Sequence, residues 1–257
     1  MTSSPAPYAP DLAPLRRLVS DACRVLAARG LADGILGHVS LRIDERSLLV
    51  RCRGPEERGL RHTVPADIRL VDLDGGPAAP GELDGGWQPP NELPLHTEVL
   101  RTRADVSAVV HAHPPAVVTA DLAGLAIRPI IGAFDIPGTR LAAGGIPVYR
   151  RGVLIRNRTL AAEMTAALAD RPAVLLRGHG LTSTGGSVQE AVLHAVSIDT
   201  IARLSLDVVQ AGGTLTDLPE EDLAELPDLG PSFHQGTAWR HELARLSDGG
   251  ATDAPAL

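Results

Sequence analysis

The sequence contains no lysine, so all 24 of its Lys and Arg side chains are arginines. A chain without lysine cannot form a Schiff base with a carbonyl substrate or anchor pyridoxal phosphate. It also lacks the lysine of a phosphate-binding loop. Any reaction on this chain that needs an electron sink must therefore take that sink from elsewhere, for example from a metal ion.

Aromatic residues and positive charge are also scarce. Two Phe, two Tyr and two Trp make up 2% of the 257 residues, which disfavours a platform for stacking nucleic-acid bases. The formal net charge of −7 disfavours binding to polyanions, because phosphate affinity depends on concentrated positive charge. We therefore expect no nucleic-acid partner.

Cysteine pairs, long apolar runs and targeting signals are missing as well. The two cysteines, Cys23 and Cys52, lie in unlike contexts, so we expect buried, reduced thiols and a cytoplasmic protein. No uninterrupted apolar run approaches the ~18 residues of a membrane span. Residues 1–10 are polar and proline-rich, unlike a signal peptide, so we expect no membrane partner.

The remaining composition is that of a globular protein, with 44% hydrophobic and 21% charged residues. Periodicity predicts helices at 11–30, 93–103, 160–168 and 187–211, and strands at 38–43, 47–52, 67–72, 106–113 and 173–177. Asp11 and Asn91 are expected to cap the first two helices.

No repeat or long linker divides the chain, so we predict one α/β domain at 11–216. A flexible segment at 1–10 and an extension at 217–257, with a short helix and a disordered tail, are expected to flank it.

The most specific local pattern is His111-Ala112-His113, at the end of a predicted strand. Alternate residues of a strand point to the same face, so both imidazoles can reach one metal ion. Buried histidines need polar partners, which makes the pair costly as plain core residues. Pro114-Pro115 ends the strand and is expected to leave the pair at a sheet edge. The alternative is a pair of partly exposed histidines in a turn.

Two further residues extend this pattern. His179 lies between two glycines directly after a predicted strand, and it is a natural third ligand for the same ion. Three imidazoles with an open coordination position are typical of a catalytic metal site. Glu92 lies at a helix entrance with His96 one turn later, where a carboxylate can ligate a metal or move protons. A first-turn glutamate favoured by the helix dipole is the simpler alternative.

A third cluster follows Gly37, in the segment Gly37-His38-Val39-Ser40. A glycine-containing turn can present backbone N–H groups to an anion, although a structural turn is the simpler interpretation. Arginine offers a bidentate fork for a substrate carboxylate, and Arg51 belongs with the arginines that could supply it. The candidate substrate-binding residues are His38, Ser40, Asn91, Arg53 and Arg177.

Together these segments resemble the class II aldolase and adducin family. The resemblance runs from the first helix to about Gly213. Besides the Gly37-His38-Val39-Ser40 turn, it rests on three motifs, at residues 91–96 (NELPLH), 103–114 (RADVSAVVHAHP) and 175–181 (LLRGHGL). It implies a three-layer α/β/α domain around a mostly antiparallel sheet, and a homotetramer with active sites between subunits.

The same resemblance implies roles for individual residues of these motifs. His111, His113 and His179 would bind a divalent metal, with zinc favoured over manganese, cobalt or iron. Glu92 would be an acid–base residue that can also ligate the metal, and we add His96 as a second catalytic candidate. The adducin branch of the family has lost catalysis, and this chain retains the histidines and the glutamate, which favours an enzyme.

The departures from the family pattern concern phosphate and proton donation. Sugar-phosphate aldolases of the family hold phosphate with a Gly-Asn pair, a Thr/Ser-Gly loop and a Ser-Ser pair, where this chain has Gly37-His38, Arg53-Gly54 and Pro90-Asn91. Ile131-Gly132 stand where a catalytic tyrosine would be expected. Sugar-phosphate cleavage is therefore not the favoured activity.

Within the family, the turn at Gly37 and the 91–96 motif are more similar to decarboxylases of dihydroxylated aromatic acids, the 3,4-dihydroxyphthalate decarboxylase branch. We therefore expect a metal-dependent lyase that decarboxylates a small hydroxylated aromatic acid through a metal-stabilised enolate. Three alternatives remain open. They are an aldolase for a small hydroxy-carbonyl or sugar-phosphate compound, a non-haem iron oxygenase, and a non-catalytic adducin-like binding protein.

Overall fold

The computed structural model describes residues 11–247, and the predicted flexible N-terminal segment and C-terminal tail fall outside them. A seven-stranded sheet forms the centre, in the order β3-β2-β1-β4-β7-β6-β5. The strands are β1 His38–Arg42, β2 Ser47–Arg51, β3 Ile68–Asp72, β4 Ala108–Ala112, β5 Val148–Tyr149, β6 Ala173–Leu176 and β7 Gly180–Gly185. Every neighbouring pair is antiparallel except β5 with β6, so the predicted mostly antiparallel α/β/α fold is confirmed.

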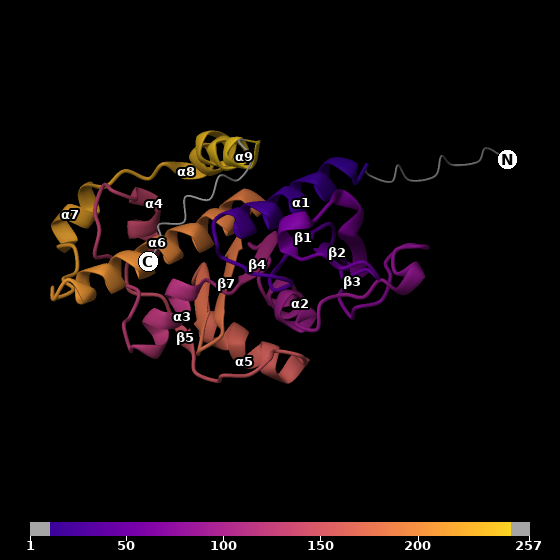
Figure 1. The fold of residues 1–257 in the computed structure, drawn as a ribbon, viewed down its shortest axis with the longest axis horizontal. Helices are drawn as coiled ribbons and strands as arrows, with labels where there is room; N and C mark the ends of the chain where they lie inside the picture. Colours follow the sequence, from indigo (N-terminus) through magenta and orange to yellow (C-terminus); the bar gives the residue numbers. More distant parts are fainter. Residues whose placement is uncertain (1–10, 248–257) are drawn as a thin grey trace.

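Helices cover both faces of this sheet (Figure 1). They are α1 Ala13–Ala28, α2 Leu93–Thr102, α3 Pro115–Leu122, α4 Ile136–Ala142, α5 Arg158–Leu168, α6 Val188–Gln210, α7 Glu220–Glu225, α8 Gly230–Ser232 and α9 Trp239–Ser247. Short helical turns lie at Leu60–His62, Pro65–Asp67, Asp84–Gly86 and Phe233–Ala238. No helix within residues 11–247 combines the length and apolar character needed to cross a membrane.

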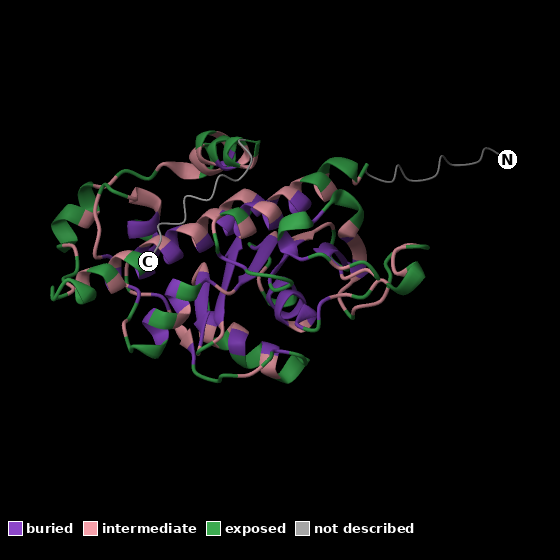
Figure 2. Ribbon diagram, viewed as in Figure 1, coloured by how far each residue is buried: buried purple, intermediate pink, exposed green. Residues whose placement is uncertain are grey.

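The strands separate two hydrophobic cores. The residues Ala108, Val110 and Ala112 of β4 face α1, α3 and α6, whereas Val109 faces the core that contains residues of α2 and α5. Because side chains alternate along a strand, His111 points to the α2 and α5 side with Val109. Figure 2 shows that the strands between the two helical layers are buried, and His111 itself is fully buried. His111 is therefore buried inside the protein, near the end of the central strand β4.

Several predicted elements match closely, and the differences have local causes. Asn91 does not cap α2, because the helix begins after Glu92 with a proline in its first turn and no side-chain cap. Asp11 does accept a hydrogen bond from the Ala13 N–H, at 3.0 Å. The histidine pair lies at the end of the central strand rather than at a sheet edge, because β1 and β7 flank β4 on both sides.

The segment after residue 216, for which one short helix was predicted, forms α7, α8 and α9. Trp239 of α9 is buried against the α1 and α6 core. Glu242 of α9 accepts hydrogen bonds from the Arg29 guanidinium, which follows α1. These contacts, distant in sequence, join the end of the chain to its beginning, and the sequence pattern alone gives no signal for them.

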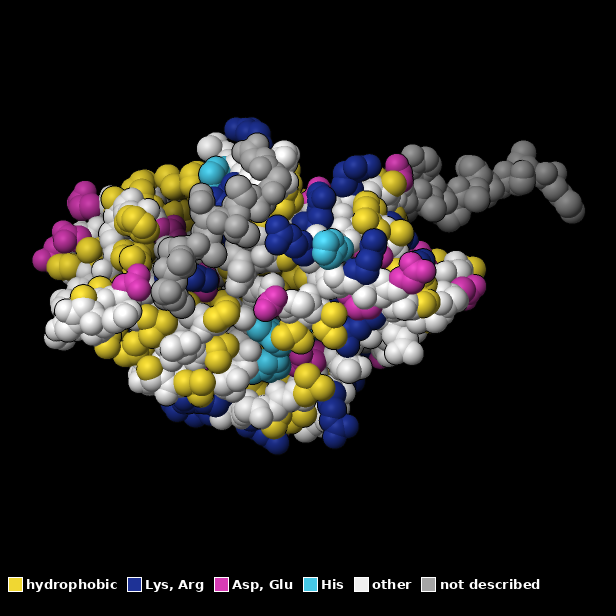
Figure 3. All heavy atoms as spheres, viewed as in Figure 1, with side chains coloured by type: hydrophobic (Ala, Val, Ile, Leu, Met, Phe, Trp, Pro, Cys, Tyr) yellow, Lys and Arg dark blue, Asp and Glu magenta, His cyan; other side chains and the backbone are white. Residues whose placement is uncertain are grey.

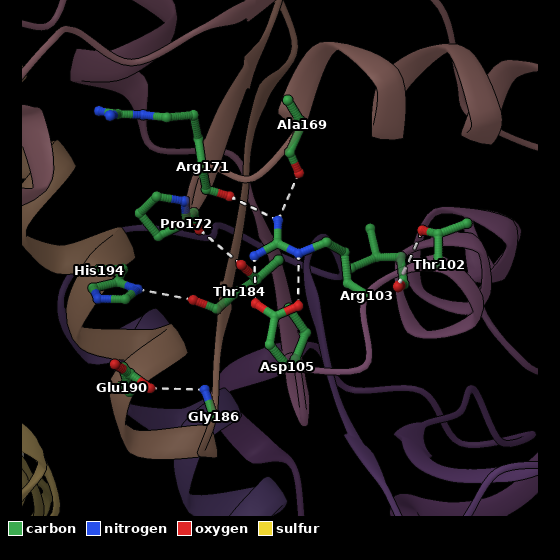
Figure 4. A network of polar contacts seen from close by, with 12 residues as sticks. Thr102, Arg103, Asp105, Ala169, Arg171, Pro172, Thr184, Gly186, Glu190 and His194 are labelled. Atoms are coloured by element: carbon green, nitrogen blue, oxygen red, sulfur yellow. Dashed lines mark hydrogen bonds and ion pairs between the residues drawn. The ribbon is translucent and has the colours of Figure 1, made fainter.

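A polar network fixes the end of the sheet away from His111 (Figure 4). Arg103 donates to both carboxylate oxygens of Asp105, at 2.9 and 2.6 Å, and to the Ala169 carbonyl at 2.7 Å. Thr184 of β7 donates its hydroxyl to the Pro172 carbonyl at 3.1 Å. Arg103 therefore joins the end of α2 to the loop after α5.

We expect Arg103→Ala to lower the free energy of unfolding by about 2 kcal/mol, the typical size of losing hydrogen bonds to a charged group. The control is Arg128→Ala, which removes an ion pair whose side chains are 42% and 46% exposed and should cost at most about 1 kcal/mol. Chemical denaturation of both variants measures the difference. Equal costs for the two variants would contradict the anchoring role of Arg103.

Candidate metal centre

Four side chains converge at one end of the sheet. They are Glu92 before α2, His111 in β4, His113 just after β4, and His179 in the turn between β6 and β7. Each offers one ligand atom, and these atoms all lie within 4.8 Å of one another. Figure 3 shows histidine side chains reaching the surface near the middle of one face. His113 and His179 are partly exposed, whereas Glu92 and His111 are buried. The cluster is thus buried on one side and open on the other.

The orientation of His111 is fixed by its own strand pairing. Its Nδ1 lies 3.0 Å from the Leu181 carbonyl oxygen of β7. A carbonyl can only accept, so the neutral ring carries its proton on Nδ1 and turns an unprotonated Nε2 toward the cluster. That Nε2 lies 2.7 Å from His113 Nε2 and 3.2 Å from Glu92 Oε2. His111 therefore presents the lone pair that metal ligation requires.

Two glycines shape the turn that carries His179. Gly178 has φ of 60°, a conformation that side chains with a Cβ rarely adopt, and its N–H donates to Asp121 Oδ2 at 2.8 Å. A Cβ at position 180 would overlap the Ala112 carbonyl oxygen of β4. Only glycine therefore lets β7 approach β4 at this point. His179 Nε2 then lies 3.6 Å from Glu92 Oε2.

Glu92 is held by one oxygen and free at the other. Its Oε1 accepts the Ile155 backbone N–H at 2.9 Å, whereas Oε2 faces His111 and His179. Burial alone would raise the pKa of this carboxyl, whereas the hydrogen bond that it accepts from the Ile155 N–H contributes to a net lowering of that pKa. Glu92 is therefore a carboxylate near neutral pH.

His113 and His179 favour the neutral form. Burial and the neighbouring His111 lower the pKa of His113 to about 3. The pKa of His179 is also lowered, first by burial and then by His111. Neutral imidazoles are the form that binds a metal ion, so the site is ready for ligation without losing protons.

A second group of polar side chains adjoins this cluster under α2. His96 lies with its Nε2 2.6 Å from His38 Nδ1 and its Nδ1 2.7 Å from Ser40 Oγ. The His38 and His111 rings are 5.0 Å apart between centroids, because β1 pairs His38 directly with His111. Both His96 nitrogens are engaged and the side chain is fully buried. His96 is thus placed behind the site, rather than at its surface.

The other predicted substrate-binding residues belong to neither group and have contacts of their own. The Arg177 guanidinium lies 3.4 Å from the buried carboxylate of Asp121. Arg51 donates to Thr63 at 3.0 Å and pairs with Glu57, on the sheet face opposite His111. Arg53 pairs through its backbone with Gln88, and Asn91 is exposed directly before Glu92.

The supports of the cluster are residues that the sequence analysis missed. They are the Leu181 carbonyl, the Ile155 N–H and the buried Asp121 carboxylate. The two backbone groups have no sequence signature. Asp121 stands in an apolar helix, where a charged residue signals a polar partner elsewhere in the chain.

The donor set fits a divalent cation. Imidazole nitrogen and carboxylate oxygen are ligands that zinc, manganese, cobalt and iron accept, and the four ligand atoms are already gathered. Three histidines leave a coordination position for a substrate, as catalytic sites do. Fold and site together thus define an α/β/α protein with a partly open cluster of three histidines and a glutamate that could hold a metal ion.

The chain belongs to the class II aldolase and adducin family, whose N-terminal domain matches residues 17–206. This confirms the resemblance seen in the sequence.

Individual proteins similar to this chain include named decarboxylases and a solved structure. A "3,4-dihydroxyphthalate decarboxylase" of Arthrobacter keyseri is 74% identical over 232 residues, which cover 90% of this chain and 94% of the relative. A protein of the same name from Rhodococcus jostii is 55% identical, over 92% of this chain and 98% of the relative. The crystal structure of an aldolase II superfamily protein from Pseudomonas syringae has a TM-score of 0.76 at 20% identity, covering 95% of this chain and 96% of that one. The last likeness shows the fold alone.

Replacing Gly180 by alanine should weaken metal binding by about 10- to 100-fold, the usual effect of disturbing the supports of metal ligands. The reason is that the new methyl group pushes β7 and His179 away from β4. Metal content after dialysis against a weak chelator, measured by elemental analysis, gives the affinity.

The control is Gly236→Ala, because a Cβ there meets nothing within 4 Å and the residue has no positive φ. Circular dichroism checks that both variants fold. A folded Gly180→Ala protein with wild-type metal affinity would show that the close approach of β7 does not position His179.

Proposed function

We propose that this chain decarboxylates a dihydroxylated aromatic acid of the 3,4-dihydroxyphthalate class. The observation that carries the proposal is the 74% identity with a decarboxylase of that name over nearly the whole chain. The retained histidines and glutamate support it, because a non-catalytic relative would have no need of four converging ligand atoms. An enzyme of the lyase class is what the relatives and the site favour together.

The cofactor in this proposal is a divalent metal, with zinc favoured, held by His111, His113 and His179 and able to gain Glu92 as a further ligand. When bound, such an ion supplies Lewis-acid stabilisation for negative charge on adjacent substrate oxygens. The absence of lysine leaves no iminium route for the same purpose. The metal centre and the composition therefore favour the same chemistry.

Glu92 is the residue proposed to move the proton. Its free Oε2 can accept the proton of a substrate hydroxyl, because the low pKa keeps it a carboxylate. It then returns that proton to the ring carbon that bears the neighbouring carboxylate. The bond from this carbon to the carboxylate breaks, carbon dioxide leaves, and the electron pair restores the aromatic ring. Solvent reprotonates the remaining phenolate, so one proton replaces one carboxylate overall.

His96 has a different role from that of a catalytic residue, which its position in the sequence suggested. Both of its ring nitrogens are bonded within the protein, so it has no free nitrogen for the substrate. We therefore propose Glu92 as the acid–base residue and His96 as a positioning residue. Proton delivery by His96 would require the rupture of a buried hydrogen bond in every turnover.

We also propose the homotetramer with shared active sites that the family resemblance implies. Leu122 is 67% exposed and would contact a side chain at Gly178, beside His179. Leu154 is 46% exposed next to Ile155, whose N–H binds Glu92. Exposed apolar side chains beside a site favour cover by another chain. Sedimentation should give a tetramer, and a fully active monomer would contradict it.

The purified protein should release carbon dioxide from 3,4-dihydroxyphthalate and leave 3,4-dihydroxybenzoate. Chelation should abolish the reaction and added zinc, manganese, cobalt or iron should restore it. Carbon dioxide release and chromatography of the product measure both effects. Dioxygen consumption, or aldehyde release from a hydroxy-carbonyl compound in place of decarboxylation, would instead favour an oxygenase or an aldolase.

Glu92→Gln should lower kcat by about 100- to 10,000-fold, because an amide cannot carry the proton. The three histidines remain, so zinc-saturated variant protein should still contain the metal. The matched control is Glu98→Gln in α2, the helix that follows Glu92, because Glu98 is a buried carboxylate that pairs with Arg158 instead. A Glu92→Gln enzyme with nearly normal kcat would remove this carboxylate from the mechanism.

A further inference from the structure

Ser40, His96 and His38 form a buried row that is joined by two hydrogen bonds. Ser40 and His96 are fully buried and His38 is 4% exposed, so water does not share their hydrogen bonds. Ser40 Oγ lies 2.7 Å from His96 Nδ1, and this is its one hydrogen-bond contact within residues 11–247. The second His96 nitrogen lies 2.6 Å from His38 Nδ1. The row therefore ends at the second nitrogen of His38, Nε2, and the His38 ring lies 5.0 Å from the His111 ring between centroids.

The hydroxyl of Ser40 sets the position of the protons. A hydroxyl has one proton to donate, and a buried donor without a partner is costly. Ser40 therefore donates to His96 Nδ1, which must be unprotonated. A neutral His96 then carries its proton on Nε2 and donates to His38 Nδ1. A neutral His38 in turn carries its proton on Nε2.

Both rings are neutral for a simple reason. Both side chains are buried, so a positive charge on either ring would be poorly solvated. A protonated His38 would also reverse the row and leave the Ser40 proton without an acceptor. The arrangement with all donors satisfied is the one in which His38 presents an N–H group at Nε2.

His38 and His111 therefore present opposite groups at Nε2, although the two residues are directly paired across β1 and β4. His111 donates through Nδ1 to the Leu181 carbonyl and presents a lone pair at Nε2. His38 accepts at Nδ1 and presents an N–H at Nε2. The first is built to hold a metal ion, whereas the second cannot ligate a metal in this tautomer.

We propose that His38 is a substrate-binding residue that donates its Nε2–H to a carboxylate or phenolate oxygen of the substrate, and that Ser40 and His96 position it by fixing its tautomer. The acceptor must be anionic or strongly polar, because a buried N–H needs a partner when the substrate displaces water. This inference rests on the proposed function for its ligand. The tautomers themselves do not depend on it.

Two pairs of variants test the proposal. Glutamine places an amide N–H near the Nε2 position of histidine, whereas alanine and leucine have no donor. His38→Ala should weaken binding of 3,4-dihydroxyphthalate and of 3,4-dihydroxybenzoate by about 10- to 100-fold, the usual loss for a hydrogen bond to a charged group. His38→Gln should bind within about fivefold of the wild type. His96→Leu should resemble His38→Ala, and His96→Gln should resemble the wild type.

Calorimetry of the metal-loaded proteins gives the affinities, and elemental analysis should find the same metal content in all of them. A loss of metal in His38→Ala would make His38 a ligand and overturn the proposal. Equal weakening in His38→Gln and His38→Ala would remove the donor role. A weakening in His96→Leu that His96→Gln shares would make His96 a packing residue only.

NMR of the histidine ring nitrogens in the zinc-loaded protein shows the tautomers directly. The signal that disappears in each variant identifies the histidine that was replaced. The expected result is an Nε2–H tautomer for His38 and His96 and an Nδ1–H tautomer for His111. An Nδ1–H tautomer at His38 would overturn the proposal even if the enzyme is a decarboxylase. Correct tautomers in a protein that releases no carbon dioxide would leave the row intact and refute the proposed reaction alone.

Discussion

The antiparallel pairing of β4 with its two neighbours is the constraint on which the site depends. On one side the pairing places His38 directly opposite His111, and on the other it places Leu181 where its carbonyl binds His111 Nδ1. A shift of one residue in either pairing would turn these side chains to the other face of the sheet. Two strand registers thus determine which nitrogen of His111 faces the cluster and which residue stands beside it.

The cost of burying polar groups explains why the rest of the site has this form. Glu92, His96 and His111 are each at least about nine-tenths buried, and each has a polar partner within the protein. Unpaired, each group would destabilise the fold by about 1–3 kcal/mol. The backbone supplies part of this pairing, through the Ile155 N–H and the Leu181 carbonyl. These backbone groups thereby orient the side chains of His111 and Glu92 in the absence of a bound metal ion.

Much of this could be predicted from the sequence. Alternation in β4 placed His111 and His113 on one face, and the glycines around His179 pointed to a tight turn. The fold class followed from the resemblance, and the main helices lie within a few residues of their predicted bounds. The short strand β5 and the strand β7 were missed, because β7 is rich in Thr, Ser and Gly and has no apolar pattern.

The limits of the prediction were physical. Side-chain direction and backbone partners depend on contacts between distant segments, which periodicity does not encode. The pairing of Arg177 with Asp121 shows this, because nothing in the sequence pattern indicates that these two side chains lie 3.4 Å apart. The part played by His96 is another case. Its spacing from Glu92 placed it on the same helix face, but only the structure shows both of its nitrogens engaged.

We propose that one divalent metal ion is held by His111, His113 and His179 beside Glu92, and the proposed reaction depends on this ion. Anomalous X-ray diffraction from crystals of the metal-loaded protein, recorded at the absorption edge of the metal, tests it most directly. We expect a single strong anomalous peak about 2.0–2.3 Å from one nitrogen of each of the three histidines. A fully loaded, active protein whose anomalous peak lies elsewhere, or contacts His38 in place of one of these ligands, would contradict it.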